Sequence, residues 1–254
     1  MDINFKNKNI LITGVGRGLG FNLLEKYFNE GANIIGIDNN KDYLRKIKKK
    51  YKNNINKKIY LYNVDLANSN EIIHFSNICK KKFLKINSLI FCARAYIKEN
   101  DNLKSWDYIL KISLKAQMLF IEHLFSLIIK SSSTIVNIGS TNSHFISEQP
   151  LSYHVAKAGL NQLSRYYANN LGKYNVRVNV VEPGLICDNK ILIKKYIKSN
   201  KILIPLQKPA TYDEICNLIF YLTSDKSSHI TGEIIRIDGG ITTNDHHKLI
   251  NKIL

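Results

Sequence analysis

Short apolar runs alternate with longer amphipathic stretches along almost the whole chain. The runs predict buried strands over 9–12, 33–37, 58–65, 88–93, 134–138, 176–181 and 234–240. Apolar residues at helical spacing predict helices over 21–28, 41–58, 71–83, 106–110, 112–129, 153–173, 190–200 and 213–222. Because strands alternate with helices and no linker or repeat divides the chain, we expect one α/β domain over residues 1–254. Its core is a doubly wound parallel sheet with helices on both faces, followed by a short tail over 241–254.

The first strand leads into a glycine-rich turn, which runs from Thr13 to Gly20 and opens the first helix. The second strand closes on an acid, Asp38. Glycines let the backbone approach a pyrophosphate, and a helix N-terminus favours its negative charge. The order of strand, turn, helix, strand and acid therefore predicts a dinucleotide-binding unit.

The composition is that of a globular protein. The chain has 254 residues, 44% of them hydrophobic, and a mean hydropathy of −0.18. No apolar run approaches the ~20 residues that a membrane helix needs, and Met1 to Lys6 lack the apolar core of a signal peptide. The cysteines are scattered, which argues against a zinc site and a disulfide framework and predicts a reduced, cytoplasmic protein. The pair His246-His247 has no partner ligands, so we expect no metal.

The formal net charge of +17 raises the question of nucleic-acid binding. Lysine, asparagine and isoleucine are abundant throughout the chain, and the densest basic segment, 41–58, carries apolar residues at helical spacing. Its lysines are therefore expected to form a solvated face. No zinc finger or disordered basic tail accompanies it, so we expect no specific nucleic-acid binding. An anionic substrate or an acidic partner remains compatible with the charge.

Tyr153 and Lys157 are four residues apart, so they share one face of a predicted helix and their head groups can meet. A free phenol titrates near pH ~10 and is a poor proton donor or acceptor at neutral pH. An adjacent ammonium favours the phenolate and lowers that pKa toward the range of efficient acid–base catalysis. Ser140 follows the strand over 134–138, and a hydroxyl facing the pair can hold a substrate carbonyl oxygen.

Together these motifs resemble the classical, single-domain short-chain dehydrogenase/reductase family over residues 8–240. The glycine turn resembles the family's cofactor motif, and Ser140, Tyr153 and Lys157 fall on its catalytic triad. Pro183-Gly184 and the segment 237–240 resemble its two later signatures. The resemblance implies a Rossmann-type fold, an NAD- or NADP-dependent oxidoreductase, and a homodimer or homotetramer. Tyr166, Tyr167 and Leu171 are candidates for the subunit interface and equally for the core.

The resemblance also implies residue roles. Tyr153 exchanges a proton with the substrate oxygen, Lys157 binds the nicotinamide ribose and lowers the pKa of the tyrosine, and Ser140 polarises the carbonyl. The residues expected to bind the cofactor are Gly14, Gly16, Arg17, Gly18, Leu19, Gly20, Asp38, Asp65, Leu66, Cys92, Ala93, Tyr153, Lys157, Pro183, Gly184 and Ile186.

The sequence departs from the family pattern at two positions. Arg94 stands where a glycine normally lets the cofactor pass, and it either turns toward an anionic substrate or is a surface replacement. Ser113 takes the place of the asparagine that joins a proton relay through the catalytic lysine. Its shorter hydroxyl can still hold a water, so we expect a slower relay and count Ser113 among the catalytic residues.

Two residues give opposite signals about the cofactor. Asp38 should accept hydrogen bonds from the adenosine ribose and repel a 2′-phosphate, which favours NAD. Arg17 occupies a position where, in this family, a basic residue often accompanies NADP. Because a carboxylate under the ribose excludes phosphate more firmly than a mobile arginine recruits it, we predict NAD, with NADP as the alternative.

The substrate side is expected to lie over 185–206, as a lid on the pocket. The run from Gly184 to Asn189 is similar to family members linked to surface-sugar and flagellin-glycan modification. His144 and His154 flank the site. Contact with the substrate is one role open to each, and a solvent-facing role is expected for both.

The leading hypothesis is an enzyme that interconverts an alcohol and a carbonyl, with a small-molecule substrate for which a sugar or sugar nucleotide is one candidate. A 3-oxoacyl-carrier-protein reductase is the alternative enzyme, since the basic surface would suit an acidic carrier. The alternative of another class is a cofactor-binding sensor or scaffold that has lost turnover.

Overall fold

The computed structural model describes residues 3–52, 58–95, 103–189, 191, 193–194 and 204–243, and these contain one sheet of parallel strands. The order is β3-β2-β1-β4-β5-β6-β7, so the chain reverses its direction of travel between the central strands β1 and β4. This confirms the predicted doubly wound parallel sheet. The strands are β1 (Asn9–Thr13), β2 (Asn33–Asp38), β3 (Ile59–Asn63), β4 (Ser88–Phe91), β5 (Thr134–Ile138), β6 (Arg177–Pro183) and β7 (Ile234–Ile237).

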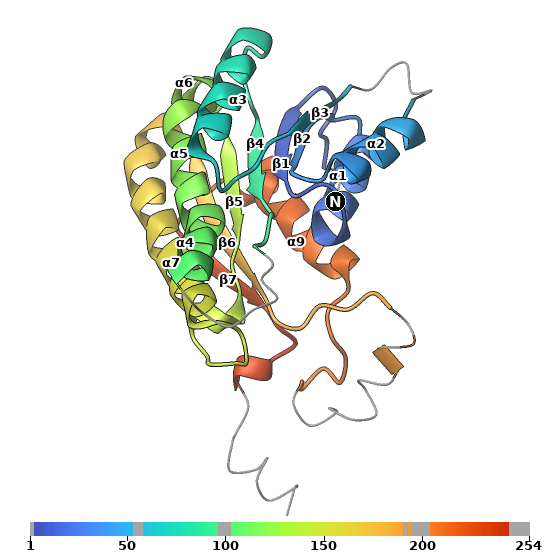
Figure 1. The fold of residues 1–254 in the computed structure, drawn as a ribbon, viewed down its shortest axis with the longest axis vertical. Helices are drawn as coiled ribbons and strands as arrows, with labels where there is room; N and C mark the ends of the chain where they lie inside the picture. The colour runs from blue at the N-terminus through green and yellow to red at the C-terminus, as the bar shows by residue number, and fades with distance from the viewer. Residues whose placement is uncertain are drawn as a thin grey trace, which may run out of the picture.

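Helices cover both faces of the sheet (Figure 1). One layer holds α1 (Gly18–Asn29), α2 (Lys41–Lys50) and α9 (Tyr212–Thr223). The other holds α3 (Ser69–Lys82), α4 (Leu103–Leu110), α5 (Ala116–His123), α6 (Phe125–Ile129) and α7 (Leu151–Leu171). No helix in the described part of the chain combines the length and apolarity that crossing a bilayer requires.

Alternation of side chains along the strands builds a core on each face of the sheet. Leu11 of β1 packs in the cluster beneath α3, α5 and α7. Its neighbours Ile10 and Ile12 pack in the cluster beneath α1 and α9. Because both faces are covered, the strands carry mostly apolar side chains on both faces, which explains the apolar runs in the sequence.

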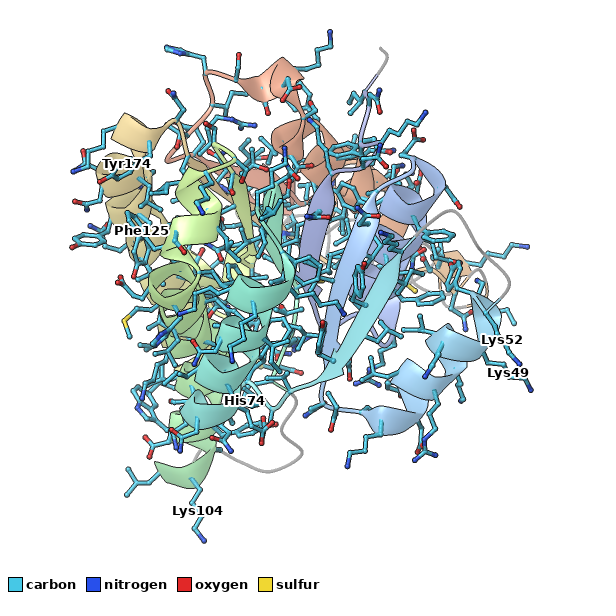
Figure 2. All side chains as sticks on the ribbon, turned by 90° about the horizontal axis from the view of Figure 1, so that it is seen from above. Lys49, Lys52, His74, Lys104, Phe125 and Tyr174 are labelled. Carbon is cyan, nitrogen blue, oxygen red and sulfur yellow. The ribbon has the colours of Figure 1, made fainter. Side chains whose placement is uncertain are left out.

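The basic helix α2 has the solvated face that the sequence predicts. Asn40 caps it by accepting hydrogen bonds from the backbone N–H groups of Asp42 and Tyr43 at 2.9 and 3.0 Å. Leu44 and Ile47 are buried. Figure 2 shows Lys49 and Lys52 projecting away from the sheet. The helix ends at Lys50 instead of residue 58, and residues 53–57 lie outside the described part of the chain.

The helical run before β5 divides at other points than the sequence suggests. Helices were expected over 106–110 and 112–129, but α4 passes directly into a π-helical turn, η1 (Lys111–Lys115), and the winding continues into α5. The break comes at Leu124, where φ −100° and ψ 6° leave the helical region. A π turn adds one residue to the helix without interrupting it, and this one carries Ser113.

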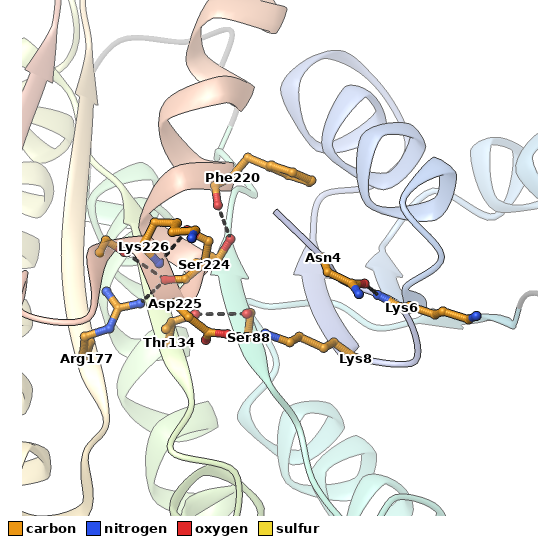
Figure 3. Close-up of polar contacts among 12 residues, drawn as sticks. Asn4, Lys6, Lys8, Ser88, Thr134, Arg177, Phe220, Ser224, Asp225 and Lys226 are labelled. Atoms are coloured by element: carbon orange, nitrogen blue, oxygen red, sulfur yellow. Dashed lines mark hydrogen bonds and ion pairs between the residues drawn. The ribbon is translucent and has the colours of Figure 1, made fainter. Parts of the chain in front are cut away.

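The edge at which the strands begin is held by polar contacts (Figure 3). Ser88 Oγ and Thr134 Oγ1 lie 2.9 Å apart across β4 and β5. Arg177, at the start of β6, donates to the carbonyls of Ser224 at 3.0 Å and Ile230 at 3.2 Å. The opposite edge, where the strands end, carries all the sequence motifs discussed above.

Candidate active site

The candidate site lies where β1, β4, β5 and β6 end. The glycine turn follows β1, Cys92 and Ala93 follow β4, Ser140 follows β5, and the Pro183-Gly184 turn closes β6. In doubly wound sheets, ligands bind at the carboxyl edge where the strand order reverses. The sequence motifs therefore meet at the reversal between β1 and β4.

The glycine turn is pressed against the loop after β4. Gly14 and Gly18 have φ values of +74° and +55°, a region that favours glycine. A Cβ on Gly14 would lie 2.8 Å from Ala93 Cα, and one on Gly20 would lie 2.0 Å from the Gly14 carbonyl oxygen. Thr13 Oγ1 accepts hydrogen bonds from Cys92 N at 3.1 Å and Ala93 N at 3.2 Å. A backbone so free of side chains fits the close approach of a pyrophosphate at the start of α1.

Asp38 is fixed at the mouth of this turn. Its Oδ2 accepts from Gly16 N and its Oδ1 from Asn40 N, both at 2.8 Å. Each carboxylate oxygen has a second lone pair, so the group can also accept from a ribose hydroxyl. A cavity of about 180 Å³ lies between α1 and α2, lined by Gly16, Phe21, Tyr43, Lys46, Ile47 and Lys50. Asp38 itself is placed to accept from an adenosine ribose at the mouth of the glycine turn.

The other residues expected to bind the adenosine half of the cofactor differ in their burial and contacts. Arg17 is exposed at the start of α1. Leu19 and Leu66 pack in the two cores, with 8% and 9% of their surface exposed. Asp65 is partly buried and accepts from Ala67 N at 2.9 Å.

Tyr212, the first residue of α9, is a site residue that the sequence analysis missed. A Cβ on Gly18 would lie 3.2 Å from its hydroxyl, so the phenol covers the glycine turn. Its backbone N–H donates to Asp188 Oδ1 at 2.9 Å. Burial is the main cause that raises the pKa of Tyr212, which keeps a neutral donor beside the expected phosphates. No motif marks it, because the turn and α9 lie far apart in the sequence.

Helix α7 brings Tyr153 and Lys157 together inside the protein. The two side chains are 8% and 4% exposed, and Lys157 Nζ lies 5.6 Å from the centre of the tyrosine ring. Lys157 Nζ also donates to the carbonyl of Ile138 at 2.6 Å. That carbonyl ends β5, two residues before Ser140. The lysine therefore links the helix of the tyrosine to the strand that delivers the serine.

Charges around Lys157 act in opposite directions. Burial away from water is the main cause that lowers the pKa of its ammonium, and the nearby Arg94 lowers it further. Tyr153, Cys92 and Glu182 oppose this shift when they are ionised. Cys92 itself is a neutral thiol at physiological pH, because burial raises its pKa to about 12.

Ser140 and Ser113 present hydroxyls with different environments. Ser140 Oγ accepts from Asn142 N at 3.2 Å within the short 3₁₀ turn η2 (Thr141–Ser143), which leaves its hydrogen able to point at a substrate. Ser113 is 1% exposed, and its Oγ has no hydrogen-bond partner among the described residues. A buried hydroxyl of this kind needs a partner such as a water, which fits the expected relay.

The guanidinium of Arg94 lies over the ring of Tyr153. Its guanidinium carbon lies 5.0 Å from the centre of the Tyr153 ring, and Nη2 donates to Gln149 Oε1 at 2.7 Å. The residue is exposed. These contacts fit both interpretations of this position, the one in which Arg94 faces the substrate and the one in which it is a surface replacement.

The two histidines differ from each other, and the expectation for His154 is wrong. His154 is buried, accepts from Ser147 N at 3.1 Å through Nε2, and has Nδ1 2.9 Å from the Pro150 carbonyl. This pairing requires the proton on Nδ1, so the ring is a structural link within the loop before α7. His144 is 42% exposed.

On the substrate side, Gly184 lies against Asp238, since a Cβ there would be 2.9 Å from Asp238 Cα. Ile186 forms an isolated bridge with Ala210. Of the expected lid, only 185–189, 191, 193–194 and 204–206 are described. The basic helix predicted over 190–200 therefore falls almost wholly outside the described residues, as do His246 and His247. The described residues contain no group of three or more His, Cys, Asp or Glu side chains placed to hold a metal ion.

Comparison with known proteins agrees with this geometry. A family model described as enoyl-(acyl carrier protein) reductase matches residues 14–242. A 3-oxoacyl-[acyl-carrier-protein] reductase of Buchnera aphidicola subsp. Schizaphis graminum is 30% identical over 249 residues, which are 94% of this chain and 99% of the relative. A trans-4-hydroxycyclohexanecarboxylate dehydrogenase of Sinomonas cyclohexanicum is 28% identical over 94% of each chain.

Among solved structures, a short-chain dehydrogenase/reductase of unknown function from Caenorhabditis elegans, determined with cofactor, superimposes with a TM-score of 0.85 at 25% identity. The match covers 96% of this chain and 98% of that one. A doubly wound sheet with a glycine cradle at its reversal point and a buried Tyr–Lys pair beside it defines a nicotinamide-dependent oxidoreductase. The chain belongs to the short-chain dehydrogenase/reductase family and is an NAD(P)-dependent enzyme of that family.

Proposed function

We propose that this enzyme interconverts an alcohol and a carbonyl compound, with Tyr153 as general acid and base. One observation carries the proposal. The buried pair of Tyr153 and Lys157 is tied by a 2.6 Å hydrogen bond to the end of the strand that delivers Ser140. The helix that carries the proton donor and the cation is thereby joined to the end of the strand that precedes the Ser140 hydroxyl.

The chain's own groups would act on the substrate oxygen. The bound nicotinamide cofactor supplies or accepts the hydride. Ser140 donates its hydroxyl hydrogen to the carbonyl oxygen, and Tyr153 gives that oxygen a proton during reduction or takes it back during oxidation. The ammonium of Lys157 holds the nicotinamide ribose and favours the phenolate of Tyr153. Ser113, through a water, would return the proton from solvent.

NAD is the proposed cofactor, and NADP is the alternative. The Asp38 carboxylate stands at the end of β2 and is held there by two backbone N–H groups. A fixed negative charge at this point favours ribose hydroxyls and repels a 2′-phosphate. Arg17, which would favour NADP, is exposed at the start of α1.

The proposed substrate is a small carbonyl or alcohol compound that carries an anionic group. The guanidinium of Arg94 over the Tyr153 ring supports this, because arginine binds carboxylates and phosphates through several donors. The relative from Sinomonas acts on a cyclohexanecarboxylate, by its name. A sugar nucleotide would supply phosphates to the same arginine, and the similarity of the run from Gly184 to Asn189 keeps a sugar among the candidates.

The second candidate function is reduction of a 3-oxoacyl-[acyl-carrier-protein]. Two observations favour it: the 30% identity to a Buchnera reductase that bears this name, and a net charge of +17 that would attract an acidic carrier. A dependence of turnover on the carrier protein, with no turnover of the free acid, would distinguish it from the first candidate.

We further propose a cytoplasmic homodimer or homotetramer. The four free cysteines are compatible with a reducing compartment. Helix α7 presents a stripe of exposed apolar side chains, Leu151, Val155 and Tyr166, to the surface. Tyr167 and Leu171, the other interface candidates, are instead buried in the core. Specific nucleic-acid binding forms no part of the proposal.

The test begins with calorimetric titration of the protein with NADH and NADPH. We expect NADH to bind about tenfold more tightly, a difference of about 1.4 kcal/mol. Turnover is then measured over a panel of carbonyl compounds with Tyr153→Phe and, as a matched control, Tyr166→Phe on the exposed face of the same helix. Loss of the acid should lower kcat by about 10²- to 10⁴-fold without weakening NADH binding, and the control should match the wild type.

Three outcomes would speak against parts of the proposal. Undiminished turnover in Tyr153→Phe would remove Tyr153 from the chemistry. Binding of cofactor with no turnover of any carbonyl compound would support the sensor or scaffold. Tighter binding of NADPH would mean that Arg17 outweighs Asp38.

A further inference from the structure

Glu182 is a buried carboxylate that none of the proposed roles uses. It is the next-to-last residue of β6, directly before Pro183, and its side chain has 0% exposed surface. Taking a carboxylate out of water costs several kcal/mol unless neighbours compensate. A buried carboxylate such as this one therefore needs neighbours that stabilise it.

One partner comes from the helix of the catalytic pair. Asn161 lies one turn beyond Lys157 on α7, and its Nδ2 donates to Glu182 Oε1 at 2.8 Å. The charge of Glu182 also reaches Lys157, where it favours the ammonium against the effect of burial. Glu182 thus meets α7 at the level of the catalytic lysine.

The other partners come from the turn that follows Ser140. The hydroxyl of Ser143 donates to the same oxygen, Oε1. His144 places Nε2 3.2 Å from Oε2. That contact is an ion pair only when the imidazole is protonated, and Oε2 makes no hydrogen bond to the described residues. The carboxylate thereby joins the turn after β5 to α7.

The remaining neighbours carry no competing charge toward Glu182. On the β5 side stands Gly139, whose Cβ would lie only 2.8 Å from Glu182 Cγ. Arg236 is the register neighbour in β7, but its Nη1 donates to Thr242 Oγ1 at 3.2 Å on the exposed edge. Among the described residues, the titratable groups with a charge interaction at this carboxylate are Lys157 and His144.

We propose that Glu182 is a positioning residue for the reaction. It holds the turn after Ser140 against α7, and it keeps a negative charge behind Lys157. Both effects act on the geometry and charge of the groups that meet the substrate oxygen, so the inference rests on the proposed function. Small misplacements of such groups lower the rate strongly, because the reacting atoms must be held in a near-attack geometry.

The variant Glu182→Gln tests the charge while preserving the shape. It keeps Oε1 as an acceptor for Asn161 and Ser143. In NADH-linked carbonyl reduction we expect kcat to fall about tenfold. The carboxylate raises the pKa of Lys157, so without it the ammonium loses its proton at lower pH. The alkaline limb of the kcat/KM profile should therefore move to lower pH. The exposed Glu30, changed to Gln, is the control and should leave both readouts unchanged.

Ser143→Ala separates position from charge. It removes one donor to the carboxylate but leaves the carboxylate charged, so we expect kcat to fall about threefold with the alkaline limb in place. A Glu182→Gln enzyme with the wild-type kcat and pH profile would overturn the proposal, whatever its Tm. If that variant does not fold, an unchanged kcat in Ser143→Ala would overturn it instead.

A readout without turnover keeps this inference distinct from the proposed function. NMR titration of the Lys157 side chain should give a lower pKa in Glu182→Gln than in the wild type. If no carbonyl compound is turned over but this difference appears, the proposed function fails while the charge placement stands. If the two titrations coincide, the positioning role of Glu182 is wrong.

Discussion

In the proposed function, Arg94 is the residue that selects an anionic substrate. Its guanidinium lies over the Tyr153 ring and donates to Gln149. A hydrogen bond to a charged group contributes about 1.5–3 kcal/mol. The arginine should therefore discriminate strongly between charged and neutral compounds of the same shape.

We predict that Arg94→Gln lowers kcat/KM for a carboxylated carbonyl substrate by about 10- to 100-fold, while its neutral methyl ester is reduced as before. The measurement is a comparison of steady-state kinetics for the acid and the ester. Arg165→Gln, which changes an exposed arginine on α7, serves as the control. Equal losses for the acid and the ester would assign Arg94 to the support of Tyr153 instead of the substrate.

Residues whose partners are close in the chain could be predicted from the sequence. Tyr153 and Lys157 share a helix face, and Thr13 to Gly20 form a single turn. Arg94 could not be placed, since its partner Gln149 is 55 positions away. Glu182 drew no attention at all, because its partners Asn161 and Ser143 are 21 and 39 positions away. Local sequence motifs do not reveal contacts between residues so far apart in the chain.

At the scale of elements, α9 shows how local chemistry fixes a helix start. Thr211 accepts from Glu214 N at 3.2 Å, and the Glu214 carboxylate accepts from Thr211 N at 2.8 Å. This capping box satisfies two backbone donors that the helix leaves open. It also sets the position of Tyr212, which covers the glycine turn.

We predict that Thr211→Ala lowers the free energy of unfolding by about 1 kcal/mol, measured by urea denaturation. The reason is the loss of the hydroxyl that caps the helix. Thr211→Ser retains this hydroxyl and should restore most of the stability. An alanine variant as stable as the wild type would mean that the box contributes nothing to the fold in solution.

The helical run from α4 to α6 marks where element prediction failed. The apolar spacing over 112–129 correctly indicated helix, but the π turn at Lys111–Lys115 inserts a residue that leaves the spacing on either side intact. No sequence pattern distinguishes a π turn from a regular α-helical turn. The π turn packs against Gly159 of α7, where a Cβ would lie 3.3 Å from Leu114. This is a tertiary contact, which the local sequence does not show.

At the scale of the whole molecule, the fold class followed from the alternation of buried strands with amphipathic helices. All strands of the described sheet were predicted within a few residues, because a strand covered on both faces is mostly apolar and forms a recognisable run. The order of the strands in the sheet could not be predicted from the pattern of apolar residues along the chain. Pairing of β1 with β4 joins segments that lie far apart in the chain.

The exposed stripe on α7 gives a prediction about assembly. Tyr166 is 61% exposed although it is large and aromatic, and such side chains are enriched at interfaces. We predict that Tyr166→Asp shifts the protein toward monomer in analytical ultracentrifugation, because a charge would be buried at the interface. Leu84→Asp, at an apolar residue away from α7 that is 86% exposed, should leave the sedimentation unchanged. A wild-type protein that sediments as a monomer would contradict the proposed assembly.

The packing of α9 against α1 also has a consequence for biosynthesis. The glycine turn belongs to the first tenth of the chain, yet Tyr212, which covers it, is translated only after four fifths of the polypeptide. More than four fifths of the protein must therefore be synthesised before Tyr212 can close the cofactor site. We expect nascent chains to mature without help from the dinucleotide, whose stabilising effect would begin only once synthesis is nearly complete.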